Sequence, residues 1–180
     1  MISRPILSHI PDIEHLSQRV IRILGQNPHP MTLQGTNSYI VGTGSKRLLI
    51  DTSSPGTQKY ASLLQSTLEK LNSTISTILL THYHYDHIGM VSSLLNLPNV
   101  KGAEVLKMKR KVSDLDNYDF KFDELNFDGL FRVEGATLLP IATPGHSDDH
   151  VSFQLLEEHA IFPGDSILGE GSTVGPFTFL

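Results

Sequence analysis

Apolar residues follow a strand-like pattern through most of this chain, with one clear helical interruption. Between residues 57 and 72, the side chains of Tyr60, Leu64, Leu68 and Leu71 recur every three or four positions. That spacing places them on one face of a helix. The pattern therefore predicts an amphipathic helix over residues 57–72 in a chain that is otherwise rich in strands.

Short apolar runs bounded by glycine, proline or polar residues predict strands on both sides of that helix. Val151, Phe153 and Leu155 alternate with polar neighbours, as the residues of a half-buried strand do. Glu157 and Glu158 are then expected to form the turn into the last strand. The predicted strands cover residues 20–24, 39–41, 48–50, 75–80, 130–133, 137–142, 151–155 and 160–162.

Three histidines and one aspartate lie within six residues, directly after the apolar run 78–80. Imidazole and carboxylate groups are typical zinc ligands. Because alternate residues of an extended chain face the same way, His82 and His84 can bind one ion together. A second helix is expected to begin near Asp86, and the turn into it leaves Asp86 and His87 free for a second ion.

Further candidate ligands occur downstream, each at the end of a predicted strand. His146 follows the tight turn Pro144-Gly145, and Asp165 follows Pro163-Gly164. A carboxylate has two oxygens and can bridge two ions, and two ions about 3.5–4 Å apart can activate one water between them at neutral pH. His150 and His159 have less supporting context, so a structural role is predicted for both.

Composition narrows the class of protein only slightly. The chain has 180 residues, of which 39% are hydrophobic and 18% charged, and its formal net charge is −5. This suits one soluble domain with a core and gives no global basic bias of the kind nucleic-acid binders often show. The absence of cysteine excludes disulfides and thiolate ligands. No apolar run approaches the ~18 residues of a membrane span, so no membrane partner is predicted.

These residues resemble the metallo-β-lactamase superfamily. The resemblance rests on the H-x-H-x-D-H motif from His82 to His87, on His146 and on Asp165. It implies an α/β fold, the αββα sandwich, with a two-zinc site at one edge. It also implies that Asp51 supports the site from behind the ligands, and it makes Asp86 the candidate catalytic carboxylate. The implied ligands are His82, His84 and His146 for the first zinc, Asp86 and His87 for the second, and Asp165 as the bridge.

The segments 24–28, 31–39, 143–150 and 164–171 are similar to the lactamase-β-like endoribonuclease family, which is mitochondrial in animals. This similarity implies a zinc-dependent endoribonuclease that cleaves single-stranded RNA through a metal-activated hydroxide. Fungal relatives with a similar opening are thioesterases on carrier-bound polyketides. The alternative is therefore a hydrolase of acyl thioesters, either glyoxalase II-like or directed to a carrier protein.

One dense basic cluster could serve an RNA substrate. It comprises Lys107, Lys109, Arg110 and Lys111, with Lys101 nearby. A surface that tracks phosphates needs such cations. A solvated charged face is nevertheless the favoured interpretation of the cluster, with contact to nucleic acid as the second.

The sequence departs from the family at its end. Family members have a further histidine, in a Pro-Gly-His-Gly motif, that completes the second metal site, and this sequence stops at Leu180 before it. The chain is therefore expected to comprise an N-terminal segment, 1–18, and a metallo-β-lactamase domain, 19–180, that is incomplete at its C-terminus. An inactive truncated product is the third functional hypothesis. The expected compartment is the mitochondrial matrix or the cytoplasm.

Overall fold

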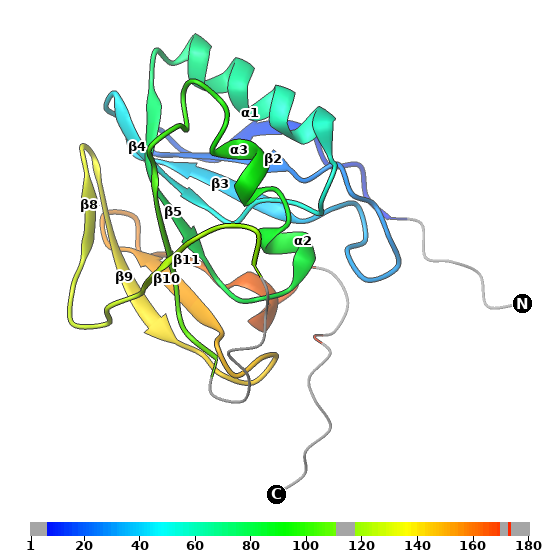
Figure 1. Cartoon of the computed structure of the whole chain (residues 1–180), viewed down its shortest axis with the longest axis vertical. Helices are drawn as coiled ribbons and strands as arrows, with labels where there is room; N and C mark the ends of the chain where they lie inside the picture. Colours follow the sequence, from blue (N-terminus) through cyan, green and yellow to red (C-terminus); the bar gives the residue numbers. More distant parts are fainter. Residues whose placement is uncertain (1–6, 111–117, 170–172, 174–180) are drawn as a thin grey trace, which may run out of the picture.

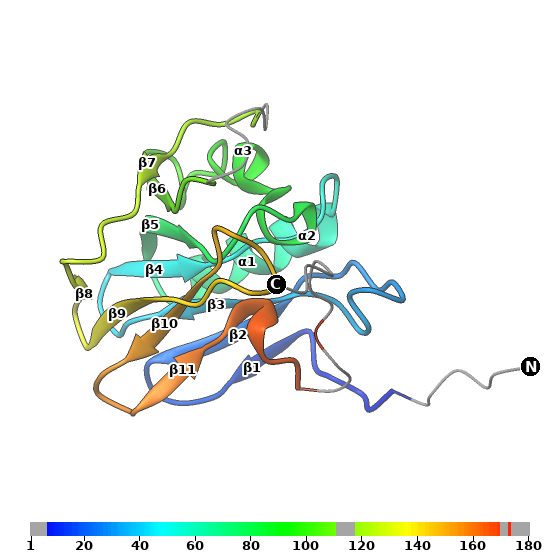
Figure 2. The same cartoon turned by 90° about the horizontal axis from the view of Figure 1, so that it is seen from below.

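Two β-sheets pack face to face, and helices cover the outer face of the first sheet (Figure 1). The computed structural model describes residues 7–110, 118–169 and 173. Within these residues, one sheet has seven strands in the order β1-β2-β3-β4-β5-β6-β7, and the other has four in the order β11-β10-β9-β8. Seen from below in Figure 2, β8–β11 lie in front of β2–β4.

The seven-stranded sheet changes direction at its middle. Strands β1 to β4 pair antiparallel, whereas β4 to β7 pair parallel. Parallel neighbours need crossover connections, which helices usually supply. The strands are β1 (Ile13–His15), β2 (Val20–Leu24), β3 (Asn37–Val41), β4 (Lys46–Ile50), β5 (Thr74–Leu80), β6 (Glu104–Lys107) and β7 (Asp123–Glu124), and the crossover helices are α1 (Gln58–Lys70), α2 (Tyr85–Ile88) and α3 (Val91–Leu94).

The four-stranded sheet is antiparallel throughout. Its strands are β8 (Phe131–Val133), β9 (Ala136–Ala142), β10 (Val151–Leu155) and β11 (Ala160–Phe162), and the 3-10 turn η1 (Gly164–Ser166) follows β11. Its inner face carries Leu138, Val151 and Phe153, which are fully buried against residues of the first sheet such as Leu48 and Leu79. The shared apolar core fixes how the two sheets meet.

A second apolar core lies between the first sheet and its helices. The α1 side chains Tyr60, Leu64 and Leu68 have no exposed surface, and they pack in one cluster with Ile23 and Ile40. These are residues of the apolar stripe that the helical spacing predicts. Among the described helices, none combines the length and apolar character that a bilayer crossing requires.

The structure confirms all eight predicted strands and the helix over residues 57–72, with each boundary shifted by two residues at most. The α/β fold class is likewise confirmed. Three short strands, β1, β6 and β7, were not predicted from the sequence.

The prediction of one helix from Asp86 onward is wrong in one respect. The chain forms two short helices, α2 and α3, with a turn at Gly89 and Met90. At Gly89 the chain passes so close to Pro55 that a Cβ atom would overlap the proline ring. This close approach accompanies the turn that separates the two helices.

Candidate metal centre

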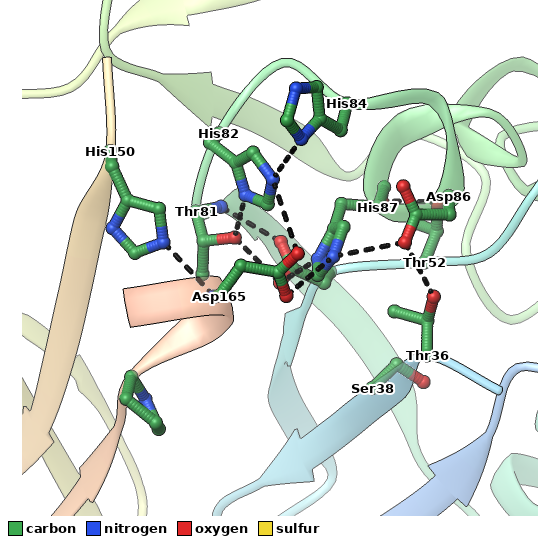
Figure 3. A network of polar contacts seen from close by, with 12 residues as sticks. Thr36, Ser38, Thr52, Thr81, His82, His84, Asp86, His87, His150 and Asp165 are labelled. Atoms are coloured by element: carbon green, nitrogen blue, oxygen red, sulfur yellow. Dashed lines mark hydrogen bonds and ion pairs between the residues drawn. The ribbon is translucent and has the colours of Figure 1, made fainter. Parts of the chain in front are cut away.

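The candidate ligands gather where strands of both sheets end. Figure 3 labels all of them except His146. The motif from His82 to His87 follows β5 of the first sheet. His146 follows β9, and Asp165 lies in η1 directly after β11, both in the second sheet. Ligand sites of open α/β sheets commonly lie outside the carboxyl ends of parallel strands, and β5 is such a strand.

The first ligand group consists of His82, His84, His146 and Asp165, whose ligand atoms all lie within 4.8 Å of one another. Nδ1 of His84 is 3.0 Å from Nε2 of His82 and 2.8 Å from Nε2 of His146. Oδ2 of Asp165 is 4.0 Å from Nε2 of His82 and 3.5 Å from Nε2 of His146. Ligands placed 2.0–2.1 Å from one tetrahedral zinc lie about 3.3 Å apart, so these spacings fit one ion.

The second ligand group consists of Asp86, His87 and Asp165. Nε2 of His87 is 3.3 Å from Oδ2 of Asp86 and 3.2 Å from Oδ1 of Asp165. Asp165 therefore turns one oxygen toward each group, which is the arrangement a bridging carboxylate needs. Zinc usually takes four ligands, so the three described residues would leave one position to be filled.

The nitrogen atoms of the first group favour a metal over a proton. Burial, together with the neighbouring His87 and His84, holds the pKa of His82 far below its usual range. Burial and His146 likewise lower the pKa of His84. Both imidazoles are therefore neutral at physiological pH, and neutral imidazole is the form that binds zinc. Their nitrogen atoms converge on one point, where a cation would offset the repulsion between lone pairs.

A hydrogen-bond chain from Asp51 fixes which nitrogen of His82 is free. The hydroxyl of Thr81 donates to Oδ2 of Asp51 at 2.8 Å and lies 2.9 Å from Nδ1 of His82. Because this hydroxyl donates to the carboxylate, it accepts the Nδ1 proton of His82. The Nε2 lone pair of His82 is thereby directed at the first ligand group. Metal-binding histidines are commonly oriented in this way by a partner on the other ring nitrogen.

His87 lies among three carboxylates. Its Nδ1 contacts Oδ2 of Asp51 at 2.8 Å, and its Nε2 faces Asp86 and Asp165. Burial alone would lower the pKa of His87, but the charge of Asp51 and hydrogen bonds with Asp165, Asp51 and Asp86 raise it well above the usual value. Without metal, His87 is therefore protonated, with its Nε2 proton directed at the place where an ion would sit.

Asp86 is held from the opposite side by Thr36, in the loop that joins β2 to β3. The hydroxyl of Thr36 donates to Oδ2 of Asp86 at 3.1 Å, and Asn27 holds Thr36 by two further hydrogen bonds. Burial raises the pKa of Asp86, but hydrogen bonds from His87 and Thr36 and the charge of His87 outweigh it and bring the pKa to about 2. The carboxylate is therefore ionised at neutral pH.

The chain matches the sequence profile of the metallo-beta-lactamase superfamily over residues 31–179. The chain belongs to this superfamily. It is 47% identical over 171 residues to the Beta-lactamase-like protein 2 homolog of Caenorhabditis elegans, covering 94% of this chain and 57% of that protein. It is also 47% identical over 167 residues to the atrochrysone carboxyl ACP thioesterase of Claviceps purpurea (strain 20.1), covering 93% and 51%. The chain thus spans about half the length of the curated relatives it matches.

Solved metallo-β-lactamase structures have the same fold. A metallo-beta-lactamase family protein of Thermus thermophilus superposes with a TM-score of 0.71 at 22% identity, over 88% of this chain and 63% of that one. BJP-1, a subclass B3 metallo-beta-lactamase of Bradyrhizobium japonicum, superposes with a TM-score of 0.59 at 22% identity, over 80% and 56%. At these identities the likeness concerns the fold alone.

In this member of the metallo-β-lactamase superfamily, the structure brings together every candidate ligand that the sequence predicts, and it places Asp51 directly behind His87. Sequence reasoning missed Thr36 and Thr81 as the residues that hold Asp86 and His82. Thr81 could have been found, because it directly follows β5 and lies beside Asp51, which directly follows the neighbouring parallel strand β4. Thr36 comes from a loop with no such signal.

The basic cluster forms the solvated face that was favoured from the sequence only in part, at Lys101 and Lys109, which are exposed. Lys107 is fully buried, and its ammonium group donates to Asp149 and to the carbonyl oxygen of Met108. Nε of Arg110 donates to Asp148 at 3.0 Å, and the guanidinium lies 3.8 Å from the centre of the Tyr83 ring. Lys109 pairs with Glu124 at the surface, and Lys111 lies outside the described residues. Lys107 and Arg110 therefore tie the loop that carries His146 to the end of β6.

A cavity of about 590 Å³ adjoins the second ligand group. The loop 31–37 forms one wall, and the segment 162–169 forms the other. Tyr39 lies in this lining with its ring 4.8 Å from that of Phe162, and burial raises the pKa of its hydroxyl, so the phenol is neutral. A substrate bound in this space would reach Asp86, His87 and Asp165.

Proposed function

We propose that this chain carries the metal centre of a zinc-dependent hydrolase that cleaves acyl thioesters, such as those borne by an acyl carrier protein. In this proposal His82, His84 and His146 hold one ion, Asp86 and His87 hold a second, and Asp165 bridges them. The chemistry that bound zinc supplies is polarisation of the substrate carbonyl and activation of water at neutral pH. Relatives named atrochrysone carboxyl ACP thioesterases support the thioester as substrate class.

The observation that carries the substrate class is the lining of the cavity. Its apolar side chains include Met31, Leu33, Phe162, Ile167 and Leu168, and no lysine or arginine occurs among the described residues that line it. Recognition of an RNA backbone depends on cations that neutralise phosphates. An uncharged acyl group suits this wall better than a polyanion does.

The internal role of the basic cluster supports the same choice. Lys107 and Arg110 are engaged by Asp149 and Asp148. Lysine and arginine side chains that are held by carboxylates of their own chain are poorly placed to track phosphates. The single-stranded RNA endonuclease implied by the sequence resemblance is therefore the second candidate.

We propose for Asp86 the role of a metal ligand alone, without the catalytic role that the resemblance implies. A group that moves protons at neutral pH works best with a pKa near the working pH, whereas the pKa of Asp86 is about 2. We assign Asp86 to holding the second ion as a permanent negative charge. The thioester carbonyl would then lie between the ligand groups and the cavity, with the acyl chain along the apolar wall.

The test compares two substrates on one preparation. The zinc-loaded chain is incubated with an acyl-pantetheine thioester and, separately, with end-labelled single-stranded RNA, beside the variant His84→Ala. We expect hydrolysis of the thioester, its loss in the variant, and intact RNA. Cleavage of RNA without thioester hydrolysis would overturn the proposal in favour of the endonuclease. Inertness toward both substrates with zinc bound would favour a non-catalytic product.

A further inference from the structure

His150 connects the three segments that carry the candidate ligands. Its side chain has no exposed surface. Its carbonyl oxygen accepts a hydrogen bond from the backbone of Thr143, in the loop before His146, and the amide of the next residue, Val151, donates to the carbonyl of Thr81. Its ring meets η1, where the backbone N–H of Asp165 donates to Nε2 at 3.1 Å (Figure 3).

These contacts define the tautomer of His150. Because the amide of Asp165 is a donor, Nε2 is the unprotonated nitrogen, and Nδ1 carries the proton. Nδ1 lies 2.8 Å from the hydroxyl oxygen of Thr143 and 3.1 Å from that of Ser166. The imidazole thus donates toward the end of β9 and accepts from η1, so it links two ligand-bearing segments through a single ring.

Packing leaves η1 little freedom to move away from this ring. Gly164, the residue before Asp165, has a φ of 53°, and a Cβ atom there would lie 2.8 Å from Nε2 of His150 and 3.0 Å from Cβ of Thr81. On its other side, the His150 ring lies 5.0 Å from the His82 ring, tilted by 31°. His150 is therefore wedged between the first ligand group and the turn that carries the bridging carboxylate.

We propose that His150 is a positioning residue for Asp165. By accepting the Asp165 N–H, it sets the direction of the side chain, so that Oδ2 faces the first ligand group and Oδ1 faces the second. His150 belongs to neither group, and its role is exerted through Asp165. The proposal rests on the metal-binding part of the proposed function and is independent of the substrate.

Zinc affinity, measured by competition with a chromophoric chelator, tests the role without any assay of hydrolysis. His150→Phe keeps a ring in the buried space but removes the acceptor, and we expect zinc affinity to fall about 10–100-fold, the usual effect of losing a partner behind a metal ligand. His150→Gln offers its side-chain oxygen near the position of Nε2 and is expected to restore most of the affinity. His159→Asn, at an exposed turn residue with φ of 51° that asparagine tolerates, is the matched control and should bind as the parent does.

A double-mutant cycle separates positioning from general destabilisation. Asp165→Ala removes the carboxylate and leaves the N–H in place. If His150 acts through that carboxylate, His150→Phe causes no further loss of affinity in the Asp165→Ala background. Equal losses in both backgrounds would overturn the proposal, and so would an unchanged affinity of His150→Phe.

Two further controls distinguish a loss of folding from a loss of positioning. Circular dichroism of the metal-free variants reports whether each is folded. If His150→Phe is not, Thr143→Val takes its place in the cycle, since it removes the nearer of the two Nδ1 partners and leaves the ring packed. If the cycle shows coupling between His150 and Asp165 but the chain does not hydrolyse thioesters, only the proposed substrate is overturned. If Asp165→Ala binds zinc as the parent chain does, both the metal-binding role and this proposal are overturned.

Discussion

Asp51 accepts a hydrogen bond from Nδ1 of His87 at 2.8 Å while its own backbone has a φ of 58°. It also accepts from the amide and the hydroxyl of Thr81, both at 2.8 Å. One carboxylate at the end of β4 therefore directs a nitrogen of His87 at the second ligand group and, through Thr81, a nitrogen of His82 at the first.

Replacing Asp51 by asparagine tests this arrangement. Asparagine tolerates a positive φ, so Asp51→Asn should keep the backbone, but its amide group would meet a donor on His87 or Thr81. We expect zinc affinity to fall about 10–100-fold with the fold retained, as measured by chelator competition and circular dichroism. Asp128→Asn, at an exposed position, is the control. Unchanged affinity in Asp51→Asn would show that His87 needs no carboxylate behind it.

Zinc binding to the second ligand group is expected to strengthen as the pH rises. The pKa of His87 is raised well above its usual value, because the charge of Asp51 and the hydrogen bonds with Asp165, Asp51 and Asp86 outweigh burial. Below that pKa a proton occupies Nε2, and above it the nitrogen is free, so zinc competes with the proton. Calorimetric titration in two buffers of different ionisation enthalpy should reveal proton release on zinc binding. His87→Gln should abolish this release, and identical heats in both buffers for the parent chain would contradict the prediction.

The hydroxyl of Thr36 should matter for metal binding although it is no ligand. Thr36→Val removes the donor to Asp86 and one acceptor of the Asn27 amide, and it keeps the shape of the side chain. We expect a loss of zinc affinity of about tenfold, at the low end of the range for such partners. Thr36→Ser, which keeps the hydroxyl, should bind zinc as the parent does. Equal affinities of the valine and serine variants would show that the hydrogen bond is dispensable.

Breaking the buried pair of Lys107 and Asp149 should cost more stability than breaking the exposed pair of Lys109 and Glu124. Neither residue has exposed surface, so Lys107→Met leaves the Asp149 charge buried without its partner. Loss of one member of such a pair costs about 3–5 kcal/mol in the free energy of unfolding, measurable by urea denaturation. Lys109→Met breaks an exposed pair with Glu124 and should cost no more than about 1 kcal/mol. Similar costs for both variants would contradict this account.

The sequence predicts those parts of the fold whose signal is local. β10 agrees with the alternation of apolar and polar residues, and α1 agrees with its apolar stripe. In both, the spacing of nearby apolar residues indicates which face is buried. β6 carries no such pattern, since it ends in Lys107, whose burial depends on Asp149 from the second sheet. β7 consists of two exposed acidic residues and exists only by pairing with β6.

The residues of the candidate site also differ in whether the sequence predicts them. The ligands were predictable because zinc chemistry restricts residue type and spacing, and a cluster of histidines and aspartates is conspicuous. Among the residues that orient the ligands, Asp51 was implied by the resemblance, but Thr36 and His150 were not predictable, because a threonine or a buried histidine has many uses. Thr36 and His150 orient a ligand only because the fold brings segments distant in sequence together at Asp86 and Asp165.

The position of the site across two sheets bears on how the chain assembles. Within the described residues, every strand of the first sheet pairs with its neighbour in sequence, so the strand pairing that positions the motif from His82 to His87 needs no strand of the second sheet. His146 and Asp165 arrive only with β9 and β11. A bound metal ion would therefore have ligands from both sheets and would tie them together as a crosslink does.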